Sequence, residues 1–282
     1  MSIVADPVQP ARRPNAAPPA RPSPLRINVN LTRELAVTSF KLKYTGSTLG
    51  YAWSLVKPLL IFGMTYAVFV QVLKAGSNDP SFPVELLLGI VLWTFFADAT
   101  SSAVGAIVAS GHMIRKAYFP RWIVVVAATL SATMTLAVNL ALVLVIGLPL
   151  GWFHVGVQTL LVPLLFVELY MLVVGVGMLM SALFVFYRDL GHVWEITLQL
   201  LFYASAILFP LTLITRHFRF AVMNPIAQIM EDMRRALITS SIPWSSTILG
   251  SLVVVPCLIV CAALVVGYLV FHRLSPRFAE AL

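Results

Sequence analysis

Residues 122–147 read WIVVVAATLSATMTLAVNLALVLVIG, a run of 26 residues without a single Asp, Glu, Lys or Arg. A helix rises about 1.5 Å per residue, so about 20 apolar residues cross the hydrocarbon core of a bilayer. Backbone N–H and C=O groups cannot stay unpaired in lipid, and a helix satisfies them internally. This stretch therefore predicts a transmembrane helix in an all-α integral membrane protein.

Similar apolar runs lie near 51–73, 84–108, 157–186, 194–214 and 246–271. The whole chain is 60% hydrophobic and 11% charged, with a mean hydropathy of +0.92. Soluble domains carry about 25% charged residues, so a soluble enzyme and a nucleic-acid-binding module are excluded as descriptions of the chain. The sequence predicts one domain of six transmembrane helices over residues 28–282.

The basic residues predict how these helices are oriented. Residues 1–27 are rich in Pro, Ala and Arg and lack the apolar core of a signal peptide, so we expect a disordered basic tail. With this tail in the cytoplasm, 14 of the 19 Lys and Arg residues lie inside and five outside. The positive-inside rule then predicts a multi-pass protein of the cytoplasmic membrane with both termini in the cytoplasm. The net charge of +8 is thus assigned to contacts with membrane lipids, and no nucleic-acid partner is expected.

A segment before the first run, residues 30–45, has the pattern of an amphipathic helix. On a helix, Leu31, Leu35, Thr38 and Leu42 would form a stripe along one face. The basic residues off this stripe are Arg33, Lys41 and Lys43. A basic amphipathic helix next to a transmembrane helix is typical of the inner membrane surface. An ordinary surface helix would show the same periodicity.

Two connectors also have distinct patterns. The inner connector 109–122 is short, basic and aromatic, and Pro120 should break the chain before the third helix. It either anchors helix ends to lipid phosphates or docks a soluble partner. The outer connector 215–245 is far longer than the usual 2–8 residues, and Asn224-Pro225 predicts a turn within it.

The residues after that turn predict a helix that dips into or lies on the outer leaflet. Its apolar face consists of Ile226, Ile229, Met230, Met233 and Leu237. Its other face carries the charged residues Glu231, Asp232, Arg234 and Arg235, at spacings that allow local ion pairs.

Motifs for catalysis or metal binding are absent from the sequence. No G-x-x-x-x-G-K-[ST] loop exists, and the nearest glycine cluster, residues 46–50, lacks the lysine that holds a phosphate. The five histidines are scattered without metal-ligand spacing. Cys257 and Cys261 lie four apart on one predicted helix and are interpreted as packing residues. We expect no catalytic residue, no metal site and no cofactor in this chain.

Two acidic residues lie within the predicted spans, Asp98 in the second and Glu168 in the fourth. Ionisable residues inside a membrane are costly and are functional candidates by default. Glu195 lies at a helix start and can reach water. These acids would suit a proton-coupled carrier. However, Asp98 and Glu168 have no basic partners within the spans, and two isolated acids are few for a proton-transfer pathway. A structural role in hydrogen bonding is the other interpretation.

Aromatic residues are concentrated on the first, second and fifth predicted helices. Those assigned to a substrate path are Trp53, Tyr66, Trp93, Phe96 and Tyr203. Flat aromatic faces stack on apolar sugar faces while the O–H or N–H bonds hydroxyl groups. The same residues also suit lipid contacts and interfacial belts.

Four stretches, in this order, resemble the membrane subunit of ABC exporters for polysaccharides such as O-antigen, teichoic acid, capsule and wall galactan. They are KYTGSTLGYAWSLVKP at 43–58, Phe119-Pro120-Arg121, Tyr187 to Leu190, and Asn224-Pro225 followed by Arg234. The resemblance extends from about residue 30 to the C-terminus. It rests on the order of the motifs together with the six predicted spans.

The resemblance implies roles for the segments outside the spans. Residues 30–45 would be an interface helix and 215–243 a re-entrant outer gate that contains Asn224 and Pro225. Arg188 and Asp189 would brace the inner turn before the fifth helix. The coupling element for the ATPase would contain Met113, Ile114, Arg115, Lys116 and Tyr118.

The resemblance also implies partners. Such permeases work as homodimers with two copies of an ATP-binding subunit, which holds the ATP and Mg, and they export a lipid-linked glycan. A single six-helix bundle is solid, whereas two facing bundles can enclose a polymer-sized path. A permease of the same fold for a drug or a lipid is the first alternative, and a secondary carrier the second.

Overall fold

The computed structural model describes residues 23–46, 48–72, 81–116, 119–153, 156–205, 207–208, 223–238 and 242–282. The described residues are helical and contain no strand. Among them, five helical segments are long and apolar enough to cross a membrane. These are Gly50–Gln71, Phe82–Ala109, Trp122–Val145, Val157–Phe184 and Ser245–Ala281. The all-helical membrane fold predicted from the sequence is confirmed.

The predicted fifth span, 194–214, corresponds to a shorter described helix. Helix α7 covers Leu190–Ala204, and most of the remaining stretch lies outside the described residues. The total of six spans therefore stays a prediction. The predicted tail at 1–27 is described only from residue 23, and helix α1, Pro24–Tyr44, already begins there, six residues before the expected start at Asn30.

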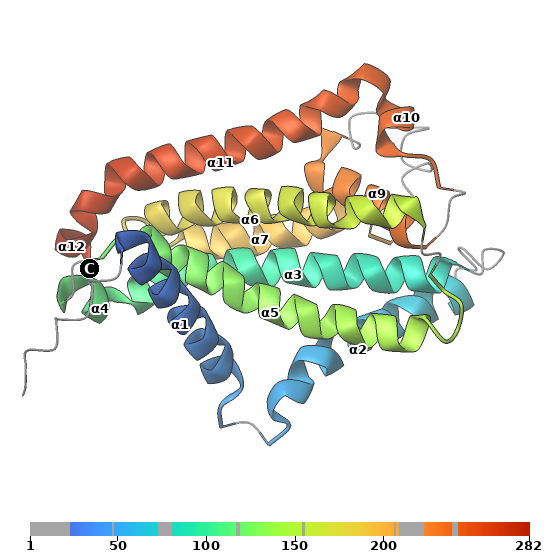
Figure 1. Ribbon diagram of the computed structural model, residues 1–282, viewed down its shortest axis with the longest axis horizontal. Helices are drawn as coiled ribbons and strands as arrows, with labels where there is room; N and C mark the ends of the chain where they lie inside the picture. Colours follow the sequence, from blue (N-terminus) through green and yellow to red (C-terminus); the bar gives the residue numbers. More distant parts are fainter. Residues whose placement is uncertain are drawn as a thin grey trace, which may run out of the picture.

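Helix α3, Phe82–Ala109, is at the centre of the molecule (Figure 1). It packs between α5, Trp122–Gly147, and α6, Val162–Phe184. Every residue from 84 to 96 is buried, because the helix is apolar on all sides and has neighbours on all sides. The core around α3 contains Leu86, Ile90 and Phe96.

Helix α11, Val254–Leu274, covers the side of α6 that faces away from α5 (Figure 1). Gly175 of α6 and Gly267 of α11 face each other at the crossing. A Cβ atom on Gly175 would lie 2.6 Å from the backbone of Ala263 and Leu264, so only glycine fits there. Without a hydrophobic drive between helices in lipid, such close backbone approach is a main source of association.

Helix α1 packs on α5 through a face that the sequence pattern did not select. Thr32, Ala36 and Tyr44 are buried there, whereas Leu42 of the predicted apolar stripe is 65% exposed. Thr32, Ala36 and Tyr44 thus face α5, and part of the leucine stripe faces outward. After α1 come η1, Gly50–Ala52, and α2, Trp53–Tyr66, which continues as the π-helical η2, Ala67–Val72.

The connectors lie at opposite ends of the molecule (Figure 1). The start of α1, α4 at Gly111–Lys116 and α12 at Phe278–Ala281 gather at one end, with η6, Ser275–Arg277, before α12. Helix α9, Pro225–Leu237, and α10, Ser245–Leu249, lie at the other. The turns η3, Val157–Leu161, and η5, Gly250–Val253, lead into α6 and α11. This separation agrees with the predicted topology, in which the 109–122 and 215–245 connectors are on different sides of the membrane.

Candidate functional site

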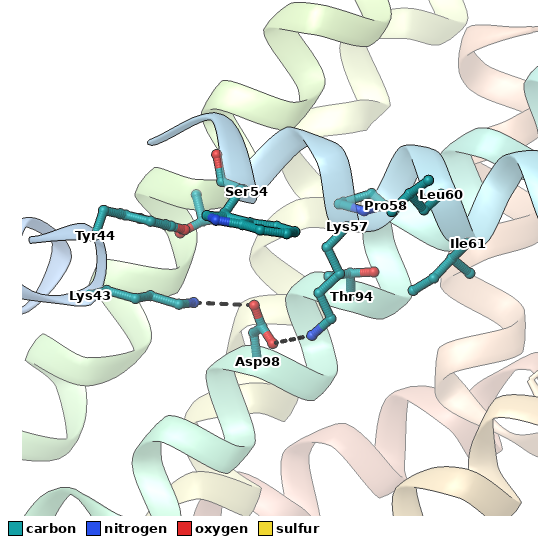
Figure 2. Close-up of a pocket in the computed structure, with 11 residues that line it drawn as sticks. Lys43, Tyr44, Ser54, Lys57, Pro58, Leu60, Ile61, Thr94 and Asp98 are labelled. Carbon is teal, nitrogen blue, oxygen red and sulfur yellow. Dashed lines mark hydrogen bonds and ion pairs between the residues drawn. The ribbon is translucent and has the colours of Figure 1, made fainter. Parts of the chain in front are cut away.

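A cavity of about 620 Å³ opens where the end of α1 and the first half of α2 approach α3 and α5 (Figure 2). Its lining is mostly apolar and aromatic, but it also contains charged and hydroxyl side chains. The lining residues are Lys43, Tyr44, Trp53, Ser54, Lys57, Pro58, Leu60, Ile61, Thr94, Asp98 and Thr135. Concave, mainly apolar sites with a few polar groups are typical of ligand binding.

Asp98 connects three helices within this cavity. Its Oδ2 atom lies 3.2 Å from Nζ of Lys43 at the end of α1, and its Oδ1 atom lies 3.7 Å from Nζ of Lys57 on α2. Figure 2 shows the two ammonium groups approaching the carboxylate from opposite sides. The sequence pattern predicted no basic partner for Asp98 within the spans, and this prediction is wrong, because Lys57 lies in the span Gly50–Gln71. The fold of α1 and α2 back onto α3 brings in lysines that are distant in the sequence.

The hydroxyl groups in this cavity have partners inside the protein. Thr94 donates from Oγ1 to the carbonyl oxygen of Ile90 at 2.7 Å, and Ser54 donates to that of Tyr51 at 2.7 Å. The Tyr44 hydroxyl lies 3.4 Å from Oγ1 of Thr135. The two lysines and Asp98 are therefore the charged groups among the residues that line the cavity.

A second cavity of about 350 Å³ adjoins the first, because both are lined by Ile61 and Thr94. It extends toward α7, and its other lining residues are Ile90, Trp93, Leu198, Gln199, Phe202 and Tyr203. We call the two cavities together the lateral cleft. Trp93 and Phe202 make an edge-to-face contact there, with ring centroids 5.7 Å apart, and Phe202 in turn contacts Tyr203 at 5.3 Å.

Three of the five residues assigned to the substrate path line the lateral cleft: Trp53, Trp93 and Tyr203. Phe96 does not, since it is 1% exposed and packs against Trp93 and Trp194 in the core. Tyr66 packs beside Phe62, with ring centroids 5.7 Å apart, and lines neither cavity. Aromatic content could be read from the sequence, whereas the face on which each ring lies could not.

Glu168 on α6, the second acidic residue within a span, does not line the lateral cleft. It accepts a hydrogen bond of 3.5 Å from Sγ of Cys257 on α11. Cys257 and Cys261 are free thiols with exposed positions. Glu195 lies 3.8 Å from the ring of His192, and both side chains are exposed. Asp98 and Glu168 thus have different kinds of partner.

The predicted coupling connector contains α4. Ile114 is 7% exposed and packs with Phe271, Phe278 and other residues near the C-terminus of the same chain. Arg115 and Lys116 are exposed, and Met113 is half-buried. Tyr118 lies outside the described residues. The exposed surface of this connector therefore carries two basic side chains, and the buried Ile114 holds the connector against the C-terminal residues.

The turn between α6 and α7 carries Arg188 and Asp189, both of which are exposed. The Arg188 guanidinium lies 5.4 Å from the ring centroid of Phe184 on α6. The backbone carbonyl of Asp189 accepts from the amides of His192 and Val193 and begins α7. Arg188 and Asp189 form no ion pair with any described residue.

Helix α9 begins as the sequence predicted. The Oδ1 atom of Asn224 accepts from the backbone N–H of Ile226 at 3.0 Å, and Pro225 occupies the first helical position. The Asn224 amide also donates to Ser205 Oγ at 3.0 Å, after the end of α7. Asn224 therefore joins the start of α9 to the end of α7.

The charged face of α9 is buried, in contrast to a helix lying on a leaflet. Arg234 is 2% exposed and pairs with Glu231 at 3.3 Å. Its guanidinium also donates to the backbone carbonyls of Glu85 at 3.2 Å and Ile207 at 2.9 Å. A Cβ atom on Gly89 of α3 would lie 2.8 Å from this guanidinium, so glycine leaves the necessary room.

Two further charged residues attach α9 to α10. Asp232 accepts from Ser245 N at 2.8 Å, from Ser245 Oγ at 2.6 Å and from Gln228 at 2.9 Å. Arg235 stacks over the Trp244 ring at 5.0 Å and donates to the carbonyl of Ile242. The local Glu231–Arg234 pairing was predicted from its spacing, but the burial of Glu231, Asp232 and Arg234 was not.

The comparisons with known proteins agree with one another. Residues 30–238 match the family described as ABC-2 type transporter. A Klebsiella pneumoniae protein named O-antigen export system permease protein RfbA is 28% identical over 86% of this chain and 91% of its own length. A Myxococcus xanthus protein of the same name is 24% identical over 88% and 94%. The polysialic acid transport protein KpsM of Escherichia coli is 24% identical over 72% and 79%.

Proposed function

The chain belongs to the ABC-2 type transporter family, and on this premise we propose that it is the membrane subunit of an exporter of a lipid-linked polysaccharide. Its relatives are named for O-antigen export and polysialic acid transport and match it over most of their length. An ATP-binding partner subunit supplies the energy. We further propose that two copies of this chain assemble with two ATP-binding subunits, which hold the ATP and Mg, in the cytoplasmic membrane.

The arrangement of the connectors supports this assignment. Helix α4, with its exposed Arg115 and Lys116, lies at the same end as the start of α1 and the C-terminus (Figure 1). This end faces the cytoplasm in the proposed topology and contacts the ATP-binding subunit. Helix α9 lies at the opposite end and closes the outer side. Its buried bonds to α3, α7 and α10 would let it move only with these helices.

The lateral cleft is the observation that carries the proposed path. It combines aromatic faces at Trp53, Trp93 and Tyr203 with an opening beside α2. Aromatic contacts of this kind contribute about 0.5–1.5 kcal/mol each. Repeated weak contacts suit a polymer that must keep moving, because a deep binding site would hold it in place.

Glycan export by cells that depend on this chain and its ATPase partner tests the proposal. Trp53 and Tyr203 are 47% and 64% exposed, so Trp53→Ala and Tyr203→Ala should fold. Each should slow export by a factor of about 2–10, as expected from the loss of one aromatic contact. Tyr203→Phe keeps the ring and should stay near wild type.

Tyr268 on α11 provides the matched control. It is 51% exposed and lines neither cavity, so Tyr268→Ala should leave export unchanged. Full export by the Trp53→Ala/Tyr203→Ala double variant would contradict a path through the lateral cleft. Absence of any glycan export by the wild-type complex, with transport of a drug or lipid instead, would contradict the proposed substrate class.

A further inference from the structure

The first cavity of the lateral cleft is lined by two basic residues and one acidic residue. Lys43 and Lys57 each carry a positive charge, and Asp98 is the acidic residue among those that line the cavity. The arrangement therefore has an excess of one positive charge beside the apolar surfaces of Pro58, Leu60 and Ile61. Each lysine ammonium has three N–H donors, so both can bind more acceptors than the two oxygens of one carboxylate provide.

The two lysines lie on either side of the start of the first apolar span. Lys43 is in the last turn of α1, before the span Gly50–Gln71 begins. Lys57 lies seven residues into that span, about 10 Å along a helix. A lysine side chain at this depth extends its ammonium toward the headgroup region. In the proposed topology this region belongs to the inner leaflet, where phosphate groups of lipids and lipid-linked molecules lie.

The ion pairs between Asp98 and the two lysines are partly exposed and can be broken by a competing anion. The side chains of Lys43, Lys57 and Asp98 are 37%, 62% and 26% exposed, so none of the three is enclosed by the chain itself. Ion pairs this exposed are weak, and the Lys57 pair, at 3.7 Å, is also long. A phosphate group carries more negative charge and more acceptor oxygens than a carboxylate. It is therefore the stronger partner for two ammonium groups.

We propose that Lys43 and Lys57 bind the phosphate or diphosphate group of the lipid-linked substrate, and that Asp98 is the counter-ion this group displaces. The inference rests on the proposed function and names the chemistry that the cleft recognises. The lipid chain would lie along the apolar surface of α2 at Leu60 and Ile61, and the glycan along the aromatic part of the cleft. Because the two lysines belong to α1 and α2, displacement of Asp98 breaks the ion pairs that link both helices to α3.

Binding to the purified complex in nanodiscs of neutral lipid tests this inference, with inorganic diphosphate, farnesyl diphosphate and farnesol as probes. Farnesyl diphosphate should bind, and farnesol should not. Asp98→Asn removes the internal competitor and should tighten diphosphate binding by a factor of about 2–30, the product expected for two exposed pairs. The Lys43→Gln/Lys57→Gln double variant should weaken it more than about tenfold.

Matched variants separate binding from folding. Lys41→Gln removes a positive charge from the same turn of α1 but does not line the cavity, so affinity should stay at the wild-type value. The Lys43→Arg/Lys57→Arg variant keeps both charges and should retain binding. Unchanged or weaker binding in Asp98→Asn, with thermal stability near wild type, would overturn the role of Asp98. Wild-type affinity in the Lys→Gln double variant would overturn the site.

The probes also distinguish the source of the phosphate. Tighter binding of farnesyl diphosphate than of inorganic diphosphate supports a lipid-linked ligand, whereas equal affinity would overturn it in favour of a free anion. Competition by phosphatidylglycerol at equal concentration would overturn it in favour of bulk lipid. A complex that exports glycan but binds no diphosphate would refute this inference alone, and one that binds diphosphate but exports no glycan would refute the proposed function alone.

Discussion

The close crossing of α6 and α11 can be perturbed by a single methyl group. In Gly175→Ala the new Cβ atom would lie 2.6 Å from the backbone of Ala263 and Leu264. Backbone atoms cannot rotate away as a side chain would, so the helices must separate by about 1 Å to restore an ordinary contact. A gap of that size removes about a quarter to a half of the dispersion energy of each neighbouring contact. We expect Gly175→Ala to lower the free energy of unfolding by about 1–3 kcal/mol.

Thermal denaturation in detergent, followed by the fraction that remains monodisperse, measures this effect. Gly105→Ala is the matched control, because Gly105 is also a helical glycine and a Cβ atom there meets nothing within 4 Å. Its stability should equal that of wild type or rise slightly, by up to about 1 kcal/mol, since alanine favours a helix more than glycine does. If Gly175→Ala unfolds at the same temperature as Gly105→Ala, the α6–α11 contact at Gly175 is refuted.

Two further predictions concern the two ends of the molecule. A cysteine at Arg115 should cross-link to the ATP-binding subunit and one at Ile114 should not, because Ile114 is 7% exposed within its own chain; capture through Ile114 alone would contradict the proposed coupling surface. Arg234→Met should lower the free energy of unfolding by about 3–5 kcal/mol, since it removes the cation beside the buried Glu231. The Arg234→Met/Glu231→Gln double variant should recover part of this loss in the same denaturation assay. If Arg234→Met is as stable as wild type, the burial of this ion pair is contradicted.

Several features of this protein follow from the sequence because their causes are local. The uncharged run at 122–147 becomes α5, Trp122–Gly147, since about 20 consecutive apolar residues are enough for a helix to cross a bilayer. Asn224-Pro225 marks the start of α9 because a side-chain cap and a proline act within one turn. The motifs shared with polysaccharide exporters likewise sufficed to identify the family.

The composition of the candidate site depended on the tertiary structure. Lys43 lies 55 residues before Asp98, and only the return of α1 and α2 onto α3 brings their side chains together. Phe96 and Trp93 are three positions apart on one helix and both are buried, yet only Trp93 also lines the lateral cleft. A helix that is apolar all round has no stripe that identifies its inner face, so periodicity cannot assign such residues. Burial of Arg234 and Asp232 on α9 depended in the same way on an acceptor supplied by α3 and on donors supplied by α10, because a charge can be buried only where another element satisfies it.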